Sequence, residues 1–179
     1  MSPTPAEALL IIDVQQALFD PPPADAAAVI GHINALAVRF RAAGRPVFLV
    51  QHESPQGALR AGTPGWAFAA GLQQAPSDLV IAKTTPDAYL RTPLEAALRE
   101  RGIRHVAVCG YASEFCVDTT VRRSAALGFE VTLAADAHTT HDKPHASGAQ
   151  IRAHENATLP DITSFGHPIR ALAGASIAL

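Results

Sequence analysis

Three ionisable side chains lie far apart along the chain, each at or just after a short apolar run. Asp13 follows "LLII", Lys83 ends "DLVIAK" (78–83), and Cys116 comes shortly after "HVAVCG" (105–110). The thiolate is the reactive form of cysteine, and a free thiol supplies little of it at neutral pH. A carboxylate that takes the proton and an ammonium that stabilises negative charge would activate the sulfur. The three residue types therefore suit a cysteine nucleophile.

The segment around Cys116 offers two further contributions to such chemistry. A helix is expected from Phe115 to Leu127, closed by Gly128, and a helix N-terminus lowers the pKa of a nearby thiol. Backbone N–H groups in the turn before that helix could form an oxyanion hole. The alternative is a buried, unreactive cysteine, which is the commoner kind. Cys109, inside "VAVCG", suits that alternative, and the pattern alone leaves both open for Cys116.

The elements that must position these residues are read from the apolar runs and helical spacing of the chain. Strands are expected at 8–14, 46–51, 78–83, 105–110 and 130–136, and helices at 25–43, 92–102, 115–127 and 147–157, before a short αβ-like tail. Strands and helices alternate, and the strands are continuously apolar. This combination is typical of a three-layer α/β/α sandwich around a mostly parallel, doubly wound sheet of about six strands.

In open parallel sheets, ligands bind beyond the carboxyl ends of the strands. Asp13, Lys83 and Cys116 are therefore expected to meet at one edge of the sheet. The long segment 52–77, which contains Gly, Pro and the single Trp, is expected to form a wall or lid of the site. Thr92 and Glu95 are expected to form a capping box at the start of their helix.

Composition narrows the class of protein. The chain has 179 residues, which suits one domain over 1–179, and 48% of them are hydrophobic, enough for a core. The net charge is −2, with no basic stripe, so neither nucleic acid nor an anionic membrane is expected as a partner. No apolar run reaches the roughly 18 residues of a membrane span, and no signal peptide is evident. With two cysteines and no disulfide framework, a reducing cytoplasm is the expected location.

Four segments together resemble the isochorismatase-like cysteine hydrolases, in their amidohydrolase branch. "LLIIDVQQALF" (9–19) is similar to the opening strand with its D-x-Q, and "AKTTPDAYLRTPLEAALRERGI" (82–103) to the segment with the catalytic lysine. "VAVCGYASEFCVDTTVRRSAALGFEVTLAADA" (106–137) resembles the nucleophile region, and "IRAHENATL" (151–159) a late helix. The resemblance covers nearly the whole chain.

The resemblance implies a catalytic triad of Asp13, Lys83 and Cys116. It also implies a cis peptide bond between Tyr111 and Ala112, and an oxyanion hole formed by the backbone N–H groups of Ala112 and Cys116. The activity implied is hydrolysis of an amide-type C–N bond in a small molecule through a thioester, without a cofactor. Homodimers or homotetramers are implied as well.

Two departures from the family pattern bear on the substrate. Metal-dependent nicotinamidases carry an Asp and a His two residues apart after the second strand, where this chain has Gln51 and His52. Members that cleave isochorismate itself lack the cysteine.

"HTTHDKPH" brings together His138, His141 and His145, but its spacing matches no standard zinc pattern, and a polar loop near the cleft is expected instead.

Aromatic and imidazole side chains near the expected cleft are candidates for the substrate pocket. Trp66 and Tyr89 are favoured, and the full set is Phe19, His52, Trp66, Tyr89, Tyr111 and Phe115.

Two other functions remain open. One is a thiol redox protein, although Cys109 and Cys116 do not form C-x-x-C. The other is a catalytically silent interaction module that kept the fold.

Overall fold

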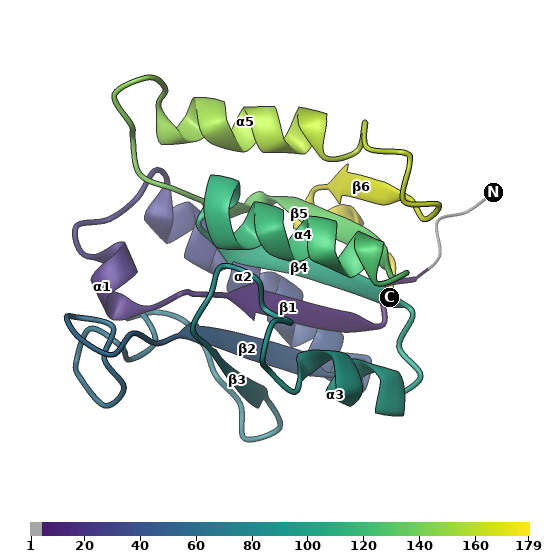
Figure 1. The fold of residues 1–179 in the computed structure, drawn as a ribbon, viewed down its shortest axis with the longest axis horizontal. Coiled ribbons are helices and arrows are strands. Elements are labelled where there is room, and N and C mark those ends of the chain that lie inside the picture. Colours follow the sequence, from purple (N-terminus) through teal and green to yellow (C-terminus); the bar gives the residue numbers. More distant parts are fainter. Residues whose placement is uncertain (1–4) are drawn as a thin grey trace.

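The computed structural model describes residues 5–179, and its centre is a six-stranded, wholly parallel sheet (Figure 1). The strands run in the order β3-β2-β1-β4-β5-β6. Their bounds are Ala8–Ile12 (β1), Val47–His52 (β2), Leu79–Lys83 (β3), His105–Tyr111 (β4), Glu130–Thr139 (β5) and Ile169–Leu172 (β6). The predicted parallel α/β sandwich of about six strands is confirmed.

Helices cover both faces of the sheet. In Figure 1, α3 and α4 lie in front of the strands, α2 lies behind them, and α5 runs along the edge that carries β6. Their bounds, with the shorter elements, are Gln16–Phe19 (α1), Ala26–Ala42 (α2), Leu94–Glu100 (α3), Ser113–Val117 (η1, a π-helix), Asp118–Ala126 (α4), Gly148–Thr158 (α5) and Gly174–Ser176 (η2, a 3-10 helix).

The two cores follow from the alternation of side chains along each strand. In β1, Leu9 and Ile11 belong to the core beneath α2, whereas Leu10 and Ile12 belong to the core beneath α3 and α4. Every residue of β1 is buried, because helices cover both faces. This explains why the strand reads as a continuous apolar run.

The capping box expected at Thr92 and Glu95 is absent. The helix α3 begins at Leu94 with Pro93 as N-cap, so Glu95 is the second helical residue and not the third. The Thr92 hydroxyl still accepts a hydrogen bond from the Leu94 N–H at 3.3 Å. A capping box does form at α5, between Ser147 and Gln150.

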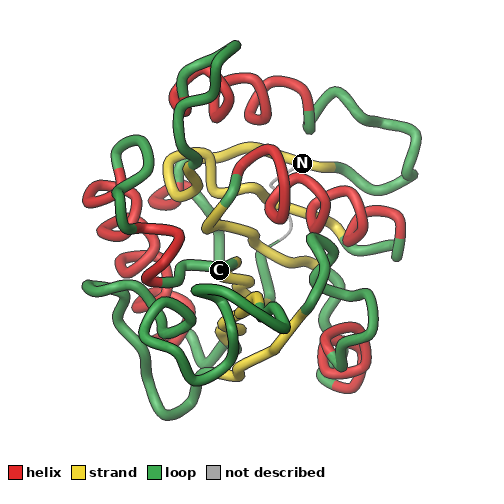
Figure 2. Tube along the Cα trace, turned by 60° about the vertical axis from the view of Figure 1, so that its left-hand side comes forward, coloured by secondary structure: helices red, strands yellow, loops and turns green. Residues whose placement is uncertain are grey.

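The carboxyl ends of the central strands meet at one edge. Ile12, the last residue of β1, is paired with Val50 on one side and Gly110 on the other, while His52 is paired with Lys83. Strand order reverses between β1 and β4, which is where ligands bind in folds of this kind. Figure 2 is turned so that this edge comes forward, and it shows loops gathered over the strand ends.

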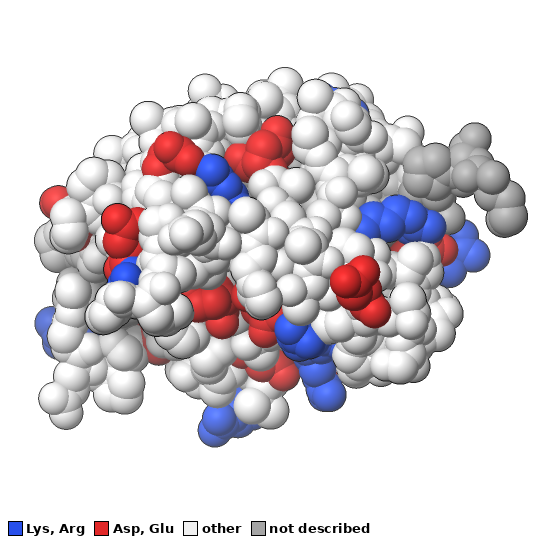
Figure 3. All heavy atoms as spheres, turned by 90° about the horizontal axis from the view of Figure 1, so that it is seen from above, with Lys and Arg blue, Asp and Glu red and all other residues white. Residues whose placement is uncertain are grey.

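The surface gives two further observations. No helix within residues 5–179 has both the length and the apolar character needed to cross a bilayer. On the face shown in Figure 3, acidic and basic side chains are interspersed and do not gather into a patch of one sign.

Candidate active site

Asp13, Lys83 and Cys116 come together at the carboxyl edge of the sheet. Asp13 directly follows β1, Lys83 is the last residue of β3, and Cys116 lies in η1 after β4. The Lys83 Nζ is 2.6 Å from Asp13 Oδ2 and 3.3 Å from Cys116 Sγ. Asp13 and Lys83 are both 1% exposed, whereas Cys116 is half-buried. The three predicted residues are thus within hydrogen-bonding reach of one another.

The ammonium of Lys83 has acceptors on four sides. Besides Asp13 and Cys116, it reaches the carbonyl of Thr85 at 3.1 Å and Nδ1 of His52 at 3.2 Å. An ammonium has three N–H groups, so four acceptors share three protons. Because an ammonium has no lone pair, it can only donate, so Nδ1 of His52 accepts this bond and the imidazole is neutral. Burial lowers the pKa of His52, and the positive charge of Lys83 lowers it further.

The acid–base state of the site differs from the expectation drawn from the helix N-terminus. Burial raises the pKa of the Cys116 thiol to about 12, and the Asp13 carboxylate adds to this, while Lys83 opposes it. The predicted lowering of this pKa is therefore wrong, because burial and a neighbouring negative charge outweigh the ammonium. Burial also raises the pKa of Asp13, against the effect of Lys83. In the free protein, these effects favour the protonated thiol over the thiolate.

Asp13 is placed to take the proton of that thiol. Its Oδ2 is bonded to Lys83, while its Oδ1 is buried and accepts no N–H or O–H hydrogen bond from the described residues. The Cys116 thiol interacts with the same carboxyl group. Transfer of the proton to Asp13 would leave a thiolate next to the Lys83 ammonium.

The turn that carries Cys116 has an unusual backbone. The Tyr111–Ala112 peptide bond is cis, and the carbonyl of Ala112 accepts hydrogen bonds from the N–H groups of Phe115 and Val117. Cys116 lies inside the π-helix η1, and the α-helix begins only at Asp118. The α-helix expected to begin at Phe115 therefore begins at Asp118. The oxyanion hole at Ala112 and Cys116 stays a prediction.

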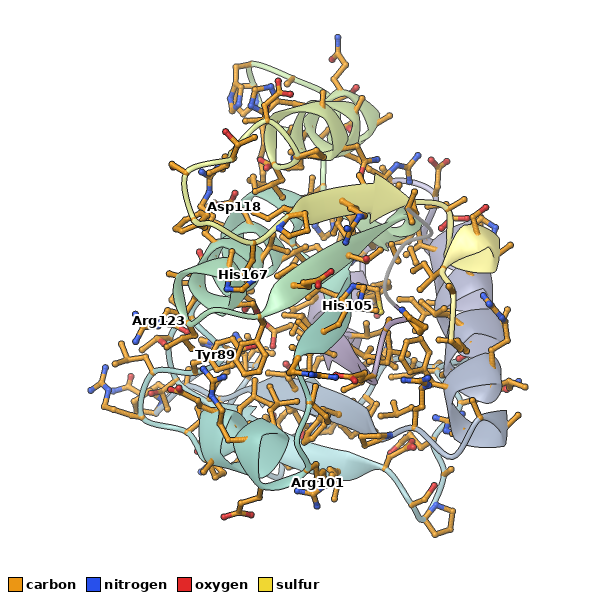
Figure 4. The ribbon with its side chains drawn as sticks, turned by 90° about the vertical axis from the view of Figure 1, so that its right-hand side faces the viewer. Tyr89, Arg101, His105, Asp118, Arg123 and His167 are labelled. Carbon is orange, nitrogen blue, oxygen red and sulfur yellow. The ribbon has the colours of Figure 1, made fainter. Side chains whose placement is uncertain are left out.

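A small cavity of about 230 Å³ opens above the sulfur. Its lining is mostly apolar and consists of Asp13, Leu18, His52, Leu59, Pro86, Tyr111, Ala112, Phe115 and Cys116. A larger hollow of about 630 Å³ lies at the opposite, amino-terminal edge, where Arg101 is labelled in Figure 4. That hollow contains none of the three predicted catalytic residues, so the smaller cavity is the candidate active site.

Three of the six predicted pocket residues line the cavity, and three do not. His52, Tyr111 and Phe115 line the cavity. Phe19 lies behind the wall, with its ring centroid 5.8 Å from that of Tyr111. Trp66 does not line the cavity, but its carbonyl accepts hydrogen bonds from Gln15 and Gln51 and so anchors the loop that does.

Tyr89 is a correction. It is 6% exposed, stacks on Phe129 with ring centroids 6.2 Å apart, and its hydroxyl is 2.8 Å from the Ser124 hydroxyl. Figure 4, in which Tyr89 is labelled, shows it among the side chains between α3 and α4. Its place in a loop sequence gave no information on the direction of the ring, which turns into the core.

Sequence reasoning missed the residues that fix the loop over the site. Residues 53–78 form no helix or strand, yet Leu59 in this loop lines the cavity. The side-chain amide of Gln15 donates to the carbonyls of His52 and Trp66 at 2.9 and 2.8 Å, and Gln51 donates to the Trp66 carbonyl at 2.7 Å. The D-x-Q of the opening motif was the available signal for Gln15.

The three histidines expected in a polar loop are divided between strand β5, which contains His138, and the loop after it, which contains His141 and His145. His138 is buried within β5, between the Ser113 hydroxyl at 2.8 Å and the Asn156 side chain at 3.0 Å, and burial lowers its pKa to about 4. The loop expectation is wrong for this residue, since β5 extends to Thr139. His141 contacts the Tyr111 hydroxyl at 2.8 Å. Within residues 5–179, no group of three or more His, Cys, Asp or Glu side chains could hold a metal ion.

The second cysteine lies on the other side of the sheet. Cys109 is buried in the core beneath α2, whereas Cys116 packs against the core beneath α3 and α4. Both sulfurs are free. This arrangement disfavours the redox alternative, because the sheet separates the two sulfurs.

Comparison with known proteins gives concordant results. The profile of the Isochorismatase domain matches residues 7–163. Over 147 residues the chain is 40% identical to streptothricin hydrolase of Streptomyces noursei, covering 80% of this chain and 58% of that protein. Over 80 residues it is 34% identical to ureidoacrylate amidohydrolase RutB of Variovorax paradoxus (strain S110), covering 44% of this chain and 31% of that protein. The chain thus spans little more than half the length of the first relative and about a third of the second.

Among solved structures, an isochorismatase from Pseudomonas putida KT2440 has a similar fold. The TM-score is 0.84 at 30% sequence identity, and the match covers 98% of this chain and 94% of that chain.

Proposed function

The chain belongs to the isochorismatase family of hydrolases, and from this premise we propose that it cleaves an amide-type C–N bond in a small molecule with Cys116 as nucleophile. The observation that carries the proposal is the position of Lys83, whose ammonium reaches both the Asp13 carboxylate at 2.6 Å and the Cys116 sulfur at 3.3 Å beside a cavity. The amide specificity is supported by the name of one relative, an amidohydrolase.

The proposed reaction begins with proton transfer. Asp13 takes the proton of the Cys116 thiol, and Lys83 stabilises the resulting thiolate. The thiolate attacks the amide carbonyl, and the backbone N–H groups of Ala112 and Cys116 stabilise the oxyanion of the tetrahedral intermediate. The C–N bond then breaks, and the amine leaves with the proton returned by Asp13.

Hydrolysis of the thioester completes the cycle. Asp13 takes a proton from water, and the hydroxide equivalent attacks the thioester carbonyl. The C–S bond breaks, the carboxylic acid leaves, and the thiol of Cys116 is restored with the proton from Asp13. Neither half of the reaction calls for a cofactor, because the three side chains supply base, nucleophile and charge stabilisation.

The experiment is a screen of small amides, carbamoyl compounds and nicotinamide for ammonia release, using wild type, Cys116→Ala and Cys109→Ala. Wild type and Cys109→Ala should release ammonia from the same compound, and Cys116→Ala should not, although its melting temperature should match that of wild type. A folded Cys116→Ala protein with full activity would disprove the nucleophile. A wild type that binds compounds but hydrolyses none would favour the silent interaction module.

Three broader features are part of the same proposal. We propose a single domain over residues 1–179, a cytoplasmic location, and assembly into a homodimer or homotetramer. Light scattering on the purified chain measures the last of these directly.

A further inference from the structure

The cavity above Cys116 has no cationic wall. Within the described residues, its lining includes neither lysine nor arginine, and six of its nine members are Leu18, Leu59, Pro86, Tyr111, Ala112 and Phe115. The hydroxyl of Tyr111 is already engaged by Nδ1 of His141 at 2.8 Å. The charged or ionisable groups that remain on the lining are Asp13, His52 and Cys116.

The positive charge of the site is committed to the catalytic residues. Lys83 is bonded to Asp13 Oδ2, Nδ1 of His52, the carbonyl of Thr85 and Cys116 Sγ. It is 1% exposed and is not part of the cavity lining. His52 adds no second cation, because Nδ1 accepts from an ammonium and burial lowers the pKa of the ring. The Asp13–Lys83 pair is therefore close to neutral as a unit.

Two cations next to lining residues, Lys143 and Arg60, do not line the cavity themselves. Lys143 Nζ lies 5.4 Å from the centroid of the Phe115 ring, but it is paired with Glu114 at 3.2 Å. Arg60 follows Leu59 in the loop, is exposed, and does not line the cavity. A carboxylate inside the cavity would lose water and find no cation on the described lining, which is costly, since Lys83 behind it is already bonded to Asp13.

We infer that the site takes a small amide whose acyl group is uncharged and apolar, and that it discriminates against amides that carry a carboxylate. That the substrate is an amide rests on the proposed function, whereas the preferences for charge and size rest on the cavity alone. The volume of about 230 Å³ is below the roughly 300–1,000 Å³ of ordinary ligand pockets, which limits the acyl group to a few heavy atoms.

The charge preference can be measured without knowing the substrate. Iodoacetamide and iodoacetate are nearly the same size, and both alkylate a thiolate at the CH₂ carbon with loss of iodide. The ratio of their rate constants at Cys116 is compared with the ratio for 2-mercaptoethanol, a neutral thiol, so that the ionised fraction of the thiol cancels. We expect the ratio at Cys116 to favour iodoacetamide by at least about tenfold more than the reference, as for a carboxylate desolvated without a partner.

Variants at the loop test the physical cause. Leu59→Lys adds a cation to the wall and should lower the ratio towards the reference value, whereas the length-matched Leu59→Met should leave it unchanged. Arg60→Gln should also leave it unchanged. The inference is overturned if wild type shows the reference ratio, or if Leu59→Lys fails to lower a high ratio, since the selectivity would then not be electrostatic.

Hydrolysis provides the second arm. Isovaleramide and malonamate share a similar shape, with a neutral isopropyl group in place of a carboxylate. We expect kcat/KM for isovaleramide to exceed that for malonamate by more than about tenfold, on the same desolvation argument. If no amide is hydrolysed while the alkylation ratio stays high, the proposed function fails and the charge preference stands.

Discussion

The ammonium of Lys83 lies 2.6 Å from Asp13 Oδ2, and both side chains are almost wholly buried. Removing one partner of a buried ion pair leaves an uncompensated charge, which costs roughly 3–5 kcal/mol. We therefore expect Lys83→Met to lower the free energy of unfolding by about that amount and to abolish hydrolysis. Urea denaturation and ammonia release are the measurements.

The matched control is the double variant Asp13→Asn with Lys83→Met. It removes both charges and should recover most of the lost stability but none of the activity, because a buried pair replaced as a unit is often nearly neutral in stability. Strictly additive losses in the double variant would show that the two residues are not energetically coupled.

The pH dependence of Cys116 alkylation follows from its raised pKa. Burial and Asp13 favour the protonated thiol and set its pKa at about 12. The thiolate fraction, and with it the rate with iodoacetamide, should rise about tenfold per pH unit from pH 7 to pH 10 without a plateau. A plateau near neutral pH would contradict the raised pKa. Cys109 is the internal control, since it is fully buried and should stay unlabelled.

Asp13→Asn should separate alkylation from hydrolysis. The Asp13 carboxylate raises the pKa of the thiol, and Lys83 lowers it. Loss of the carboxylate should thus lower this pKa and make alkylation at pH 7 faster than in wild type, while amide hydrolysis is lost with the base. Slower alkylation in the folded variant would mean that Asp13 activates the sulfur without any substrate present.

The fold and the meeting of Asp13, Lys83 and Cys116 at one edge of the sheet could be predicted, because both follow from the pattern of apolar strands. Strands buried on both faces, such as β1, are continuously apolar, and parallel strands bring their carboxyl ends together. That geometry predicted where Asp13, Lys83 and Cys116 would meet, and the family resemblance implied their roles.

The pocket and the acid–base state could not be predicted, because they depend on contacts between distant segments. Residues 53–78 have no periodicity, so nothing in them indicated that Leu59 reaches the cavity or that Tyr89, in a later loop, turns into the core. The pKa of Cys116 depends on burial by several elements, which outweighs the effect expected of a helix N-terminus.

Gln15 and Gln51 should hold the loop over the site to different degrees. Gln15 makes three hydrogen bonds, to the carbonyls of His52 and Trp66 and from the His52 N–H, whereas Gln51 makes one, to Trp66. At about 1 kcal/mol per bond, Gln15→Leu should lose more stability than Gln51→Leu. Limited proteolysis within residues 53–78 should accelerate in the same order. Equal effects of the two variants would show that the Gln15 bonds do not fix the loop.

Gly110 should tolerate no side chain, because a Cβ there would clash with the backbone of the neighbouring strand. Gly44 is the control, since it has a left-handed backbone without such a clash. A Cβ at Gly110 would lie 2.1 Å from the carbonyl oxygen of Ile12, and this backbone belongs to β1 at the centre of the sheet. Gly44 also has a positive φ of 68°, but a Cβ there meets nothing within 4 Å. Gly44→Ala should cost about 1–2 kcal/mol for the left-handed backbone alone, and Gly110→Ala should cost clearly more, or prevent folding, because β1 and β4 must separate. Thermal unfolding of both variants checks this, and equal losses would mean that the strands do not approach this closely.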